Sequence, residues 1–207
     1  KNYPYELKNK INLVKCDLRN PKQVINLTKK TDILIHCAAT TSGAKDIVNK
    51  PYIHVTDNAI MNSVITRAAF ENEVKHIIMF SCTVMYRSSK KPLKENDFNP
   101  NKEMYSNYFG GGWMKVFTEK MSEFYSRLGK NKYTVIRHSN IYGPYDKFDL
   151  EKSHVFGASI TKVIKNKNGK IKIWGDGKEK RDLLYIDDLV DFVKKIMFKP
   201  KKSFCVY

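Results

Sequence analysis

The sequence predicts an α/β fold in which helices cover both faces of a doubly wound parallel sheet. Two observations lead to this fold class: short, continuous apolar runs recur along the chain, and stretches with helical periodicity separate them. The chain has 207 residues, of which 42% are hydrophobic. This is enough for one substantial domain with a packed core.

Four apolar runs are predicted to be strands that are buried on both faces, because each is short and continuous. They are 12–16 (NLVKC), 33–38 (ILIHCA), 76–80 (HIIMF) and 133–137 (YTVIR). The final residues, SFCVY, have the composition of a further strand that is cut short.

Between these runs lie stretches with the periodicity of amphipathic helices. In the clearest one, apolar residues recur every three or four positions and share one face: Trp113, Phe117, Met121, Phe124 and Leu128. Lys115, Glu119 and Ser122 lie on another face of this helix. A second helix is predicted over 57–70, with four residues directed inward: Ile60, Val64, Ile65 and Ala68. A third is predicted to begin near Asp187, whose carboxylate is a good N-cap.

The net charge of +17 raises the question of nucleic-acid binding. The cations are mostly lysines spread along the whole chain, only six are arginines, and there is no basic recognition helix. We therefore expect a surface that attracts small anions rather than a nucleic-acid partner. No run approaches the ~20 apolar residues of a membrane helix, so no membrane partner is expected. Four widely spaced cysteines without metal-ligand spacing favour a reducing cytoplasm and no metal site.

The residues that follow each apolar run carry the functional information, because ligands of doubly wound sheets bind beyond the carboxyl ends of the strands. They are, in chain order, Asp17 and Leu18, then His36, Ala38 and Ala39, then Ser81 and Thr83, then Asn140. A glycine-rich turn opens a dinucleotide-binding domain, and none precedes position 12. We therefore expect the chain to lack both termini of the complete protein.

In this order, the residues resemble the motifs of the extended short-chain dehydrogenase/reductase family. That family has an Asp-aliphatic pair, an H-x-A-A turn, an S-x-S/T segment and an R-P-x-N-x-Y-G-P block, and here His138 replaces the proline. The segments YGPYDKF, SHV and WGDG further resemble those of GDP-L-fucose synthases. The resemblance implies a Rossmann-like domain over 1–145, a substrate-binding segment over 146–180 and a return to the first domain over 181–207.

The same resemblance implies an NAD(P)-dependent nucleotide-sugar epimerase or reductase that acts, with NADP or NAD, on a GDP-4-keto-6-deoxyhexose. The residues implied to bind the cofactor are Asp17, Leu18, His36, Ala38, Ala39, Lys115 and His154. Those implied to hold the sugar nucleotide are Asn140, Trp174 and Arg181, with Arg181 at the pyrophosphate. Members of the family form dimers through two long helices, so a homodimer is implied as well.

The implied reaction needs a phenol that exchanges a proton with the sugar hydroxyl. Its ordinary pKa of ~10 must fall for this, and a nearby lysine ammonium lowers it. Lys115 matches the lysine of the family's Y-x-x-x-K motif, and it would also bind the nicotinamide ribose. Ser81 would orient the sugar hydroxyl, with help from Thr83.

The tyrosine of that motif is missing, because Gly111 stands four residues before Lys115. Tyr108 lies seven residues before Lys115, two helical turns away on the same face, and is the first candidate for the proton donor. The glycines at 110–112 disfavour a regular helix and would let the backbone bend Tyr108 into the site. Tyr105 is a second candidate, and the remaining alternative is a protein whose donor is lost or supplied elsewhere.

His154 matches the histidine of the acid/base pair with which GDP-L-fucose synthases invert two sugar carbons, although it is also placed to cap a following helix. Thr83 stands where the cysteine of that pair would be, and Cys82 would point to the other side of a strand. This departure affects double epimerisation but leaves hydride transfer untouched. Two alternatives remain open: a UDP-hexose 4-epimerase or dehydratase, and a catalytically inactive nucleotide-binding scaffold.

Overall fold

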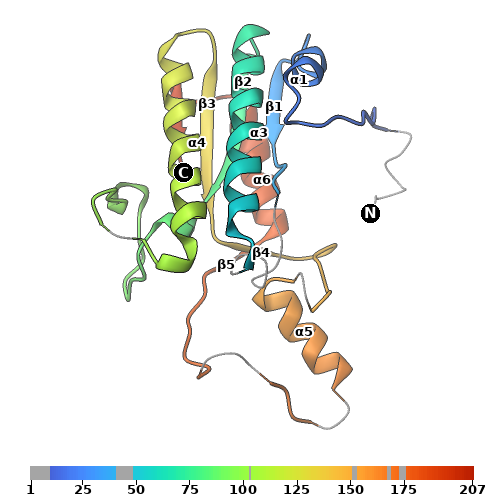
Figure 1. The fold of residues 1–207 in the computed structure, drawn as a ribbon, viewed down its shortest axis with the longest axis vertical. Helices are drawn as coiled ribbons and strands as arrows, with labels where there is room; N and C mark the ends of the chain where they lie inside the picture. The colour runs from blue at the N-terminus through green and yellow to red at the C-terminus, as the bar shows by residue number, and fades with distance from the viewer. Residues whose placement is uncertain (1–9, 41–48, 103, 151–152, 167–168, 173–175) are drawn as a thin grey trace.

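A computed structural model describes residues 10–40, 49–102, 104–150, 153–166, 169–172 and 176–207. Its core is a parallel sheet with the strand order β1-β2-β3-β6 (Figure 1). These strands are β1 (Ile33–His36), β2 (His76–Cys82), β3 (Lys132–His138) and β6 (Phe204–Val206). A parallel pair beyond the end of β3 consists of β4 (Asn140–Tyr142) and β5 (Leu183–Tyr185). Three of the four predicted runs and the final segment are therefore strands, as expected.

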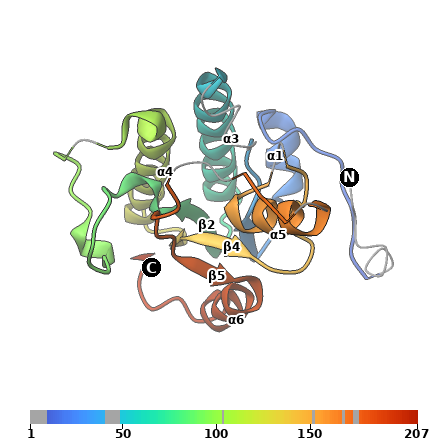
Figure 2. The ribbon, with the colours of Figure 1, turned by 90° about the horizontal axis from the view of Figure 1, so that it is seen from below.

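Helices cover both faces of this sheet, which confirms the predicted doubly wound α/β class. The helices α3 (Pro51–Glu71) and α4 (Phe109–Arg127) lie side by side on one face, and α6 (Ile186–Met197) lies on the other (Figure 1). The short helix α1 (Pro21–Leu27) packs against α3. The helix α5 (Val155–Lys165) lies with β4 and β5 beyond the carboxyl ends of the main strands (Figure 2).

The core has two layers because side chains of a strand alternate between the faces of a sheet. On one face, Ile77 and Met79 of β2 pack with residues of β3 and α3. On the other, Ile78 packs with Leu189 of α6. This burial of both faces explains why the strands are continuous apolar runs rather than alternating ones.

The predicted strand at 12–16 is wrong, since this segment belongs to no strand and pairs with none of the described strands. Leu13 and Val14 are more than half exposed. A strand needs a hydrogen-bonding neighbour, and within the described residues β1 pairs only with β2. Apolar composition alone therefore does not make this segment part of the sheet.

The helix α4 has the two faces that its periodicity predicts, and its apolar face is the exposed one. Trp113, Phe117 and Phe124 are 37%, 48% and 56% exposed. The buried residues on the other side are small or polar: Gly112, Met114, Val116, Thr118, Glu119, Ser122 and Ser126. In α3, Ile65 and Ala68 are buried as predicted, but Ile60 is 48% exposed, so its inward orientation was wrong.

The glycines at 110–112 form the first turn of α4, so the predicted break in the helix is wrong. Gly110 lies against α3, where a Cβ atom would come within 2.7 Å of Val55 Cγ2. A Cβ atom at Gly112 would lie 2.5 Å from Met104 Sδ. Close packing at these two positions outweighs the weak helix propensity of glycine.

The third predicted helix begins one residue before Asp187, at Ile186, and the residue at its N-cap is Tyr185. Asp187 and Asp188 lie in the first turn instead, where their negative charges interact favourably with the positive end of the helix dipole. Among the described residues, no helix is long and apolar enough to cross a membrane.

Candidate active site

Three of the residues that the sequence predicts for catalysis, Ser81, Thr83 and Lys115, lie at the carboxyl end of β2. Ser81 is the second-last residue of this strand, and Thr83 begins the short 3-10 turn η2 (Thr83–Met85) that follows it. Lys115, on α4, donates a hydrogen bond from Nζ to the backbone oxygen of Phe80 at 2.8 Å. The ammonium is thereby hydrogen-bonded to the peptide group that joins Phe80 to Ser81.

Ser81 is fully buried, and its hydroxyl makes no hydrogen bond to the described part of the chain. Buried hydroxyl groups nearly always have a partner, so a site for a polar ligand group at this position is consistent with the structure. Thr83, in contrast, is exposed just beyond the carboxyl end of β2. The two hydroxyl groups therefore differ strongly in their contact with solvent.

The positive charge of Lys115 acts on two histidines at this edge. Burial lowers the pKa of His36, the hydrogen bond that His36 makes to Asn62 Oδ1 partly offsets this, and the charge of Lys115 lowers the pKa further. Burial likewise lowers the pKa of His138, and the charges of Lys115 and His154 add to this effect. The cation of Lys115 therefore lies in the same electrostatic environment as the ends of β1 and β3.

His36 is held in a buried network between the sheet and the two covering helices. Its Nε2 lies 2.8 Å from Asn62 Oδ1 on α3, and Asn62 Nδ2 donates to Thr118 Oγ1 on α4 at 2.9 Å. Because Asn62 Oδ1 only accepts, Nε2 of His36 carries the proton. This network fixes the end of β1 relative to both helices.

Four of the predicted cofactor residues line one open hollow beside β1. They are Asp17, Leu18, Ala38 and Ala39, and Met61 of α3 lies with them. The hollow measures about 810 Å³. The backbone of its wall is held by Asn58, which accepts from Thr40 N at 2.8 Å and donates to Thr40 O at 2.9 Å. Small side chains and a fixed backbone are suited to the flat base of a dinucleotide.

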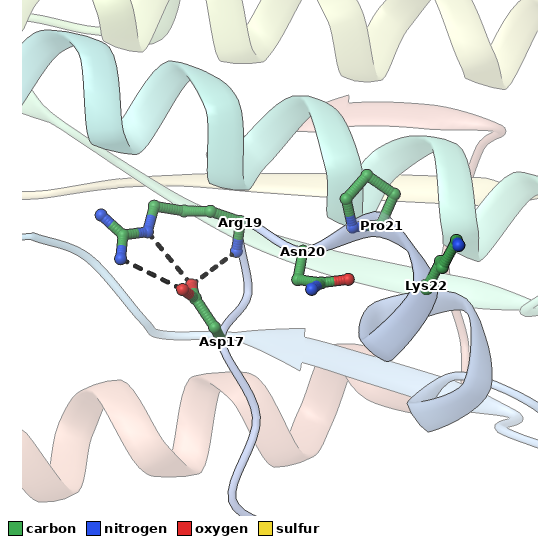
Figure 3. A pocket seen from close by; sticks show the side chains of 5 residues that line it. All are labelled: Asp17, Arg19, Asn20, Pro21 and Lys22. Atoms are coloured by element: carbon green, nitrogen blue, oxygen red, sulfur yellow. Dashed lines mark hydrogen bonds and ion pairs between the residues drawn. The ribbon is translucent and has the colours of Figure 1, made fainter.

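The carboxylate of Asp17 is already bound within the chain (Figure 3). Arg19 donates to it from its backbone N at 3.0 Å, and from Nε and Nη2 at 3.1 Å each. These hydrogen bonds lower the pKa of Asp17. Arg19 also forms an ion pair with Asp57 of α3 at 3.3 Å. The charge of Asp17 is thus largely balanced by Arg19, in an ion pair whose two side chains are about half exposed.

Tyr108 ends the 3-10 turn η4 (Ser106–Tyr108) and is the N-cap residue of α4. It is 38% exposed, and its ring lies 5.8 Å from the ring of Tyr105. Gly111 differs from the glycines beside it, because a Cβ atom there would have no atom within 4 Å. One helical turn before Lys115, where the motif has its tyrosine, there is open space.

His154 occupies the N-cap position of α5, but its side chain makes no capping hydrogen bond. The structure therefore does not support a capping role for this side chain. The imidazole is exposed and lies near His138. Asn140, the first residue of β4, donates from Nδ2 to the backbone oxygen of Asp182 at 3.2 Å. It thus holds the segment that carries the exposed Arg181. Trp174 lies outside the described residues.

Sequence reasoning missed the buried ion pair between Glu119 and Arg137 and the two asparagines of α3. A signal for the pair was present, because Glu119 follows Lys115 by one helical turn and Arg137 begins the R-P-x-N block. The asparagines gave none, since buried polar side chains on a helix are identified only by their partners.

Comparison with known proteins decides the family. The sequence matches the NAD dependent epimerase/dehydratase family over residues 1–205. The chain belongs to this family. Family membership agrees with the parallel sheet, the hollow beside β1 and the position of Lys115.

Two curated relatives are similar to the chain along most of its length. A GDP-L-colitose synthase from Yersinia pseudotuberculosis is 28% identical over 183 residues, covering 86% of this chain and 59% of the relative. A GDP-L-fucose synthase from Azorhizobium caulinodans is 28% identical over 194 residues, covering 91% of this chain and 62% of the relative. The chain thus spans about three fifths of the length of these relatives.

Solved structures confirm the fold. A UDP-glucose 4-epimerase from Thermotoga maritima, with UDP-glucose, matches with a TM-score of 0.82 at 21% identity, covering 99% of this chain and 65% of that one. A GDP-L-fucose synthetase from Naegleria fowleri, bound to NADP, matches with a TM-score of 0.77 at 22% identity, covering 93% and 64%.

Proposed function

We propose that the full-length protein is an NAD(P)-dependent nucleotide-sugar epimerase or reductase that acts on a GDP-4-keto-6-deoxyhexose. The observation that carries the proposal is the hydrogen bond from Lys115 Nζ to the Phe80 carbonyl, next to the buried hydroxyl of Ser81. The GDP-sugar preference is supported by the two curated relatives, and NADP by the Naegleria structure.

In the proposed site, Asp17, Leu18, Ala38 and Ala39 contact the adenosine half of the cofactor, for which their shared hollow has room. His36, which is buried, lies beneath the nicotinamide half. When bound, the nicotinamide supplies or takes up a hydride. All other chemistry belongs to side chains of the protein.

Lys115 has three N–H donors, and one of them is bound to Phe80. Among the described residues the other two have no hydrogen-bond partner, and we propose that they bind a ribose hydroxyl and stabilise a phenolate. We propose Tyr108 as the phenol that exchanges a proton with the sugar hydroxyl. Ser81 orients that hydroxyl with the help of Thr83, and Asn140, Trp174 and Arg181 hold the nucleotide diphosphate.

We propose His154 as an acid/base group at the sugar carbons next to the carbonyl. Its exposure near the end of β3 and its lack of a capping bond support this role. Thr83 is a poor base in the position of the usual cysteine. We therefore expect hydride transfer to be faster than double epimerisation.

The experiment is NADPH oxidation by the full-length protein with a panel of GDP- and UDP-linked 4-keto sugars, beside NAD-dependent interconversion of UDP-hexoses. Lys115→Met should lower kcat/KM by about two to four orders of magnitude, because it removes the cation that stabilises the phenolate. Lys120→Met is the matched control, since Lys120 is exposed on the same helix and pairs with Glu123. Equal activity in both variants would remove Lys115 from the site.

A catalytically inactive nucleotide-binding scaffold is the second candidate, and the glycine at position 111 favours it. Tyr108→Phe and Gly111→Tyr separate the two. An enzyme that uses Tyr108 loses turnover in the first variant, while a scaffold has no turnover to lose. Activity that appears only in Gly111→Tyr, which fills the open space before Lys115, would support the scaffold.

We propose that the protein is a homodimer in which the exposed apolar face of α4 is covered by a second copy. Trp113, Phe117, Phe124 and Leu128 contribute to this face, and Ile60 of α3 is exposed as well. Large contiguous apolar surfaces mark interaction sites. Sedimentation velocity of the wild-type protein should give a dimer at micromolar concentration, and a monomer there would contradict the proposal.

We also propose that the protein works in the cytoplasm, which is supported by its four free cysteines. The positive surface then serves sugar nucleotides rather than nucleic acid. The same proposal divides the chain into three parts. Residues 1–145 bind the cofactor, residues 146–180 bind the substrate, and residues 181–207 belong again to the cofactor-binding domain.

A further inference from the structure

The guanidinium of Arg137 is a buried cation that has no role in the proposed chemistry. Its side chain is 9% exposed and that of its partner Glu119 is 7% exposed. Nε of Arg137 donates to both carboxylate oxygens, at 3.0 and 3.2 Å, and Nη2 donates to Oε2 at 2.6 Å. The pair has the bidentate geometry that gives the strongest charge-assisted hydrogen bonds.

The remaining donor of Arg137 holds a loop. Nη1 donates to the hydroxyl of Tyr86 at 2.5 Å and to the backbone oxygen of Glu95 at 2.8 Å. The guanidinium also lies 5.4 Å from the ring centre of Tyr86 and 5.3 Å from that of Phe98, within range of cation–π attraction. One cation therefore contacts Tyr86, Glu95 and Phe98, which belong to the same segment, 86–98.

The ion pair and its hydrogen bonds lie close in sequence or register to three of the proposed catalytic groups, Lys115, Ser81 and Thr83. Glu119 lies one helical turn after Lys115 on α4. Arg137 is the register partner of Ser81 in the parallel pairing of β2 and β3. Tyr86 follows Thr83 at the end of η2, and its backbone N donates to Thr83 O at 3.0 Å.

A buried ion pair is a costly way to stabilise a core, because apolar residues of similar volume often do as well or better. What the planar guanidinium adds is orientation, since its donors lie in fixed directions. In this protein those directions point to one helix on one side and to a surface loop on the other. The arrangement suits the alignment of a site better than the filling of a core.

We propose that Arg137 is a positioning residue that fixes the segment 86–98 against β3 and α4 and thereby sets Ser81 and Thr83 relative to Lys115. The effect on turnover rests on the proposed function. The effect on the loop does not, and the two are measured separately.

The test is Tyr86→Phe in the full-length protein, because it removes one hydroxyl from the network and leaves the buried ion pair intact. Tyr125→Phe is the matched control, as the ring of Tyr125 packs on Phe70 and Phe124 at the far end of the helix. The loop contains three exposed trypsin sites, Arg87, Lys90 and Lys94, while the bond after Lys91 resists trypsin because Pro92 follows it. Cleavage at these sites should be roughly tenfold faster in Tyr86→Phe, since a hydrogen bond to a charged group is lost.

With the sugar substrate, kcat of Tyr86→Phe should fall by about tenfold or more, because small misplacements of reacting groups slow catalysis. The KM for NADPH should stay unchanged, since the cofactor hollow beside β1 is remote from the loop. A fall in kcat with unchanged KM distinguishes positioning from general loss of structure. Arg137→Lys, which keeps the charge but not the fork, should behave in the same way.

Wild-type rates of both cleavage and turnover in Tyr86→Phe and Arg137→Lys would overturn the proposal. If Arg137→Lys fails to fold, Tyr86→Phe alone decides. If the wild-type protein turns over no nucleotide sugar, the proposed function fails, and the cleavage rates still decide whether Arg137 holds the loop.

Discussion

The two faces of α4 use opposite kinds of side chain for opposite environments. The face toward the sheet is small and polar, with Thr118, Glu119 and Ser122 buried in hydrogen bonds. The outer face carries Phe117 and Phe124, which are about half exposed. The difference teaches that amphipathic periodicity separates two faces of a helix but does not say which one belongs to the core.

The largest expected effect follows from breaking the buried ion pair. Glu119→Ala leaves the cation of Arg137 buried without its counter-charge, so the free energy of unfolding should fall by about 3–5 kcal/mol. Glu123→Ala is the control, because Glu123 is on the same helix and pairs with the exposed Lys120 and Arg127. That variant should cost less than about 1 kcal/mol. Urea unfolding measures both, and similar losses would contradict the contrast between the faces.

The next effect concerns the approach of α4 to α3. Gly110→Ala should destabilise the fold by about 1–3 kcal/mol, since its methyl group would collide with the stiff side chain of Val55. Gly111→Ala should stabilise it by up to about 1 kcal/mol, because the position is open and alanine favours a helix. Thermal unfolding of the two variants should therefore shift in opposite directions. Shifts of the same sign would refute the packing difference between adjacent glycines.

A pH effect of intermediate size sharpens the description of the polar face. The pKa of His36 is lowered by burial, so the folded protein binds a proton less readily than the unfolded chain, whose His pKa is ~6.5. Stability is then full above that pH and is lost as the pH falls below it, by at most about 1.4 kcal/mol per pH unit for one group. The variant His36→Gln, whose amide can still donate to Asn62, should lose less stability than the wild type between pH 6.5 and 5. Parallel curves would show that His36 protonates equally in both states.

The smallest effect on the fold of the single chain is expected at the outer face. Phe117→Ser should change the free energy of unfolding of a dilute monomer by about 0.5 kcal/mol or less, because the ring is half exposed. If a second copy covers this face, the wild-type midpoint rises with protein concentration and that of Phe117→Ser does not. Calorimetry at two concentrations measures both quantities. If the unfolding midpoint of the wild-type protein did not change with protein concentration, this face would not be a dimer interface.

The sequence predicts the central strands well because their apolar runs are buried on both sides and bounded by turns. It fails at 12–16, where similar composition has no neighbouring strand among the described residues. It also fails at the glycines of α4, because the contacts of Gly110 with Val55 are tertiary. Long-range pairing decides both outcomes, and no local pattern reports it.

Within the candidate site, motif order predicted which residues lie at the carboxyl edge. Ser81 and Lys115 are brought together there, and four predicted cofactor residues share one hollow. The spacing did not reveal that Arg19 binds the carboxylate of Asp17, nor that Asn62 joins His36 to Thr118. The roles of Tyr108 and His154 stay predictions.

The sheet topology has a consequence for how such a protein can change. In the sheet, β1, β2 and β3 are neighbours in chain order, with α3 between the first two and α4 between the last two, whereas β6 pairs with β3 only after a long connection that contains β4, α5, β5 and α6. Lengthening a connection costs little conformational entropy, on the order of 0.6 kcal/mol for each doubling. Insertions and exchanges within that connection can therefore accumulate while the first three strands keep their pairing, so this part of the chain can diversify at small cost to the stability of the sheet.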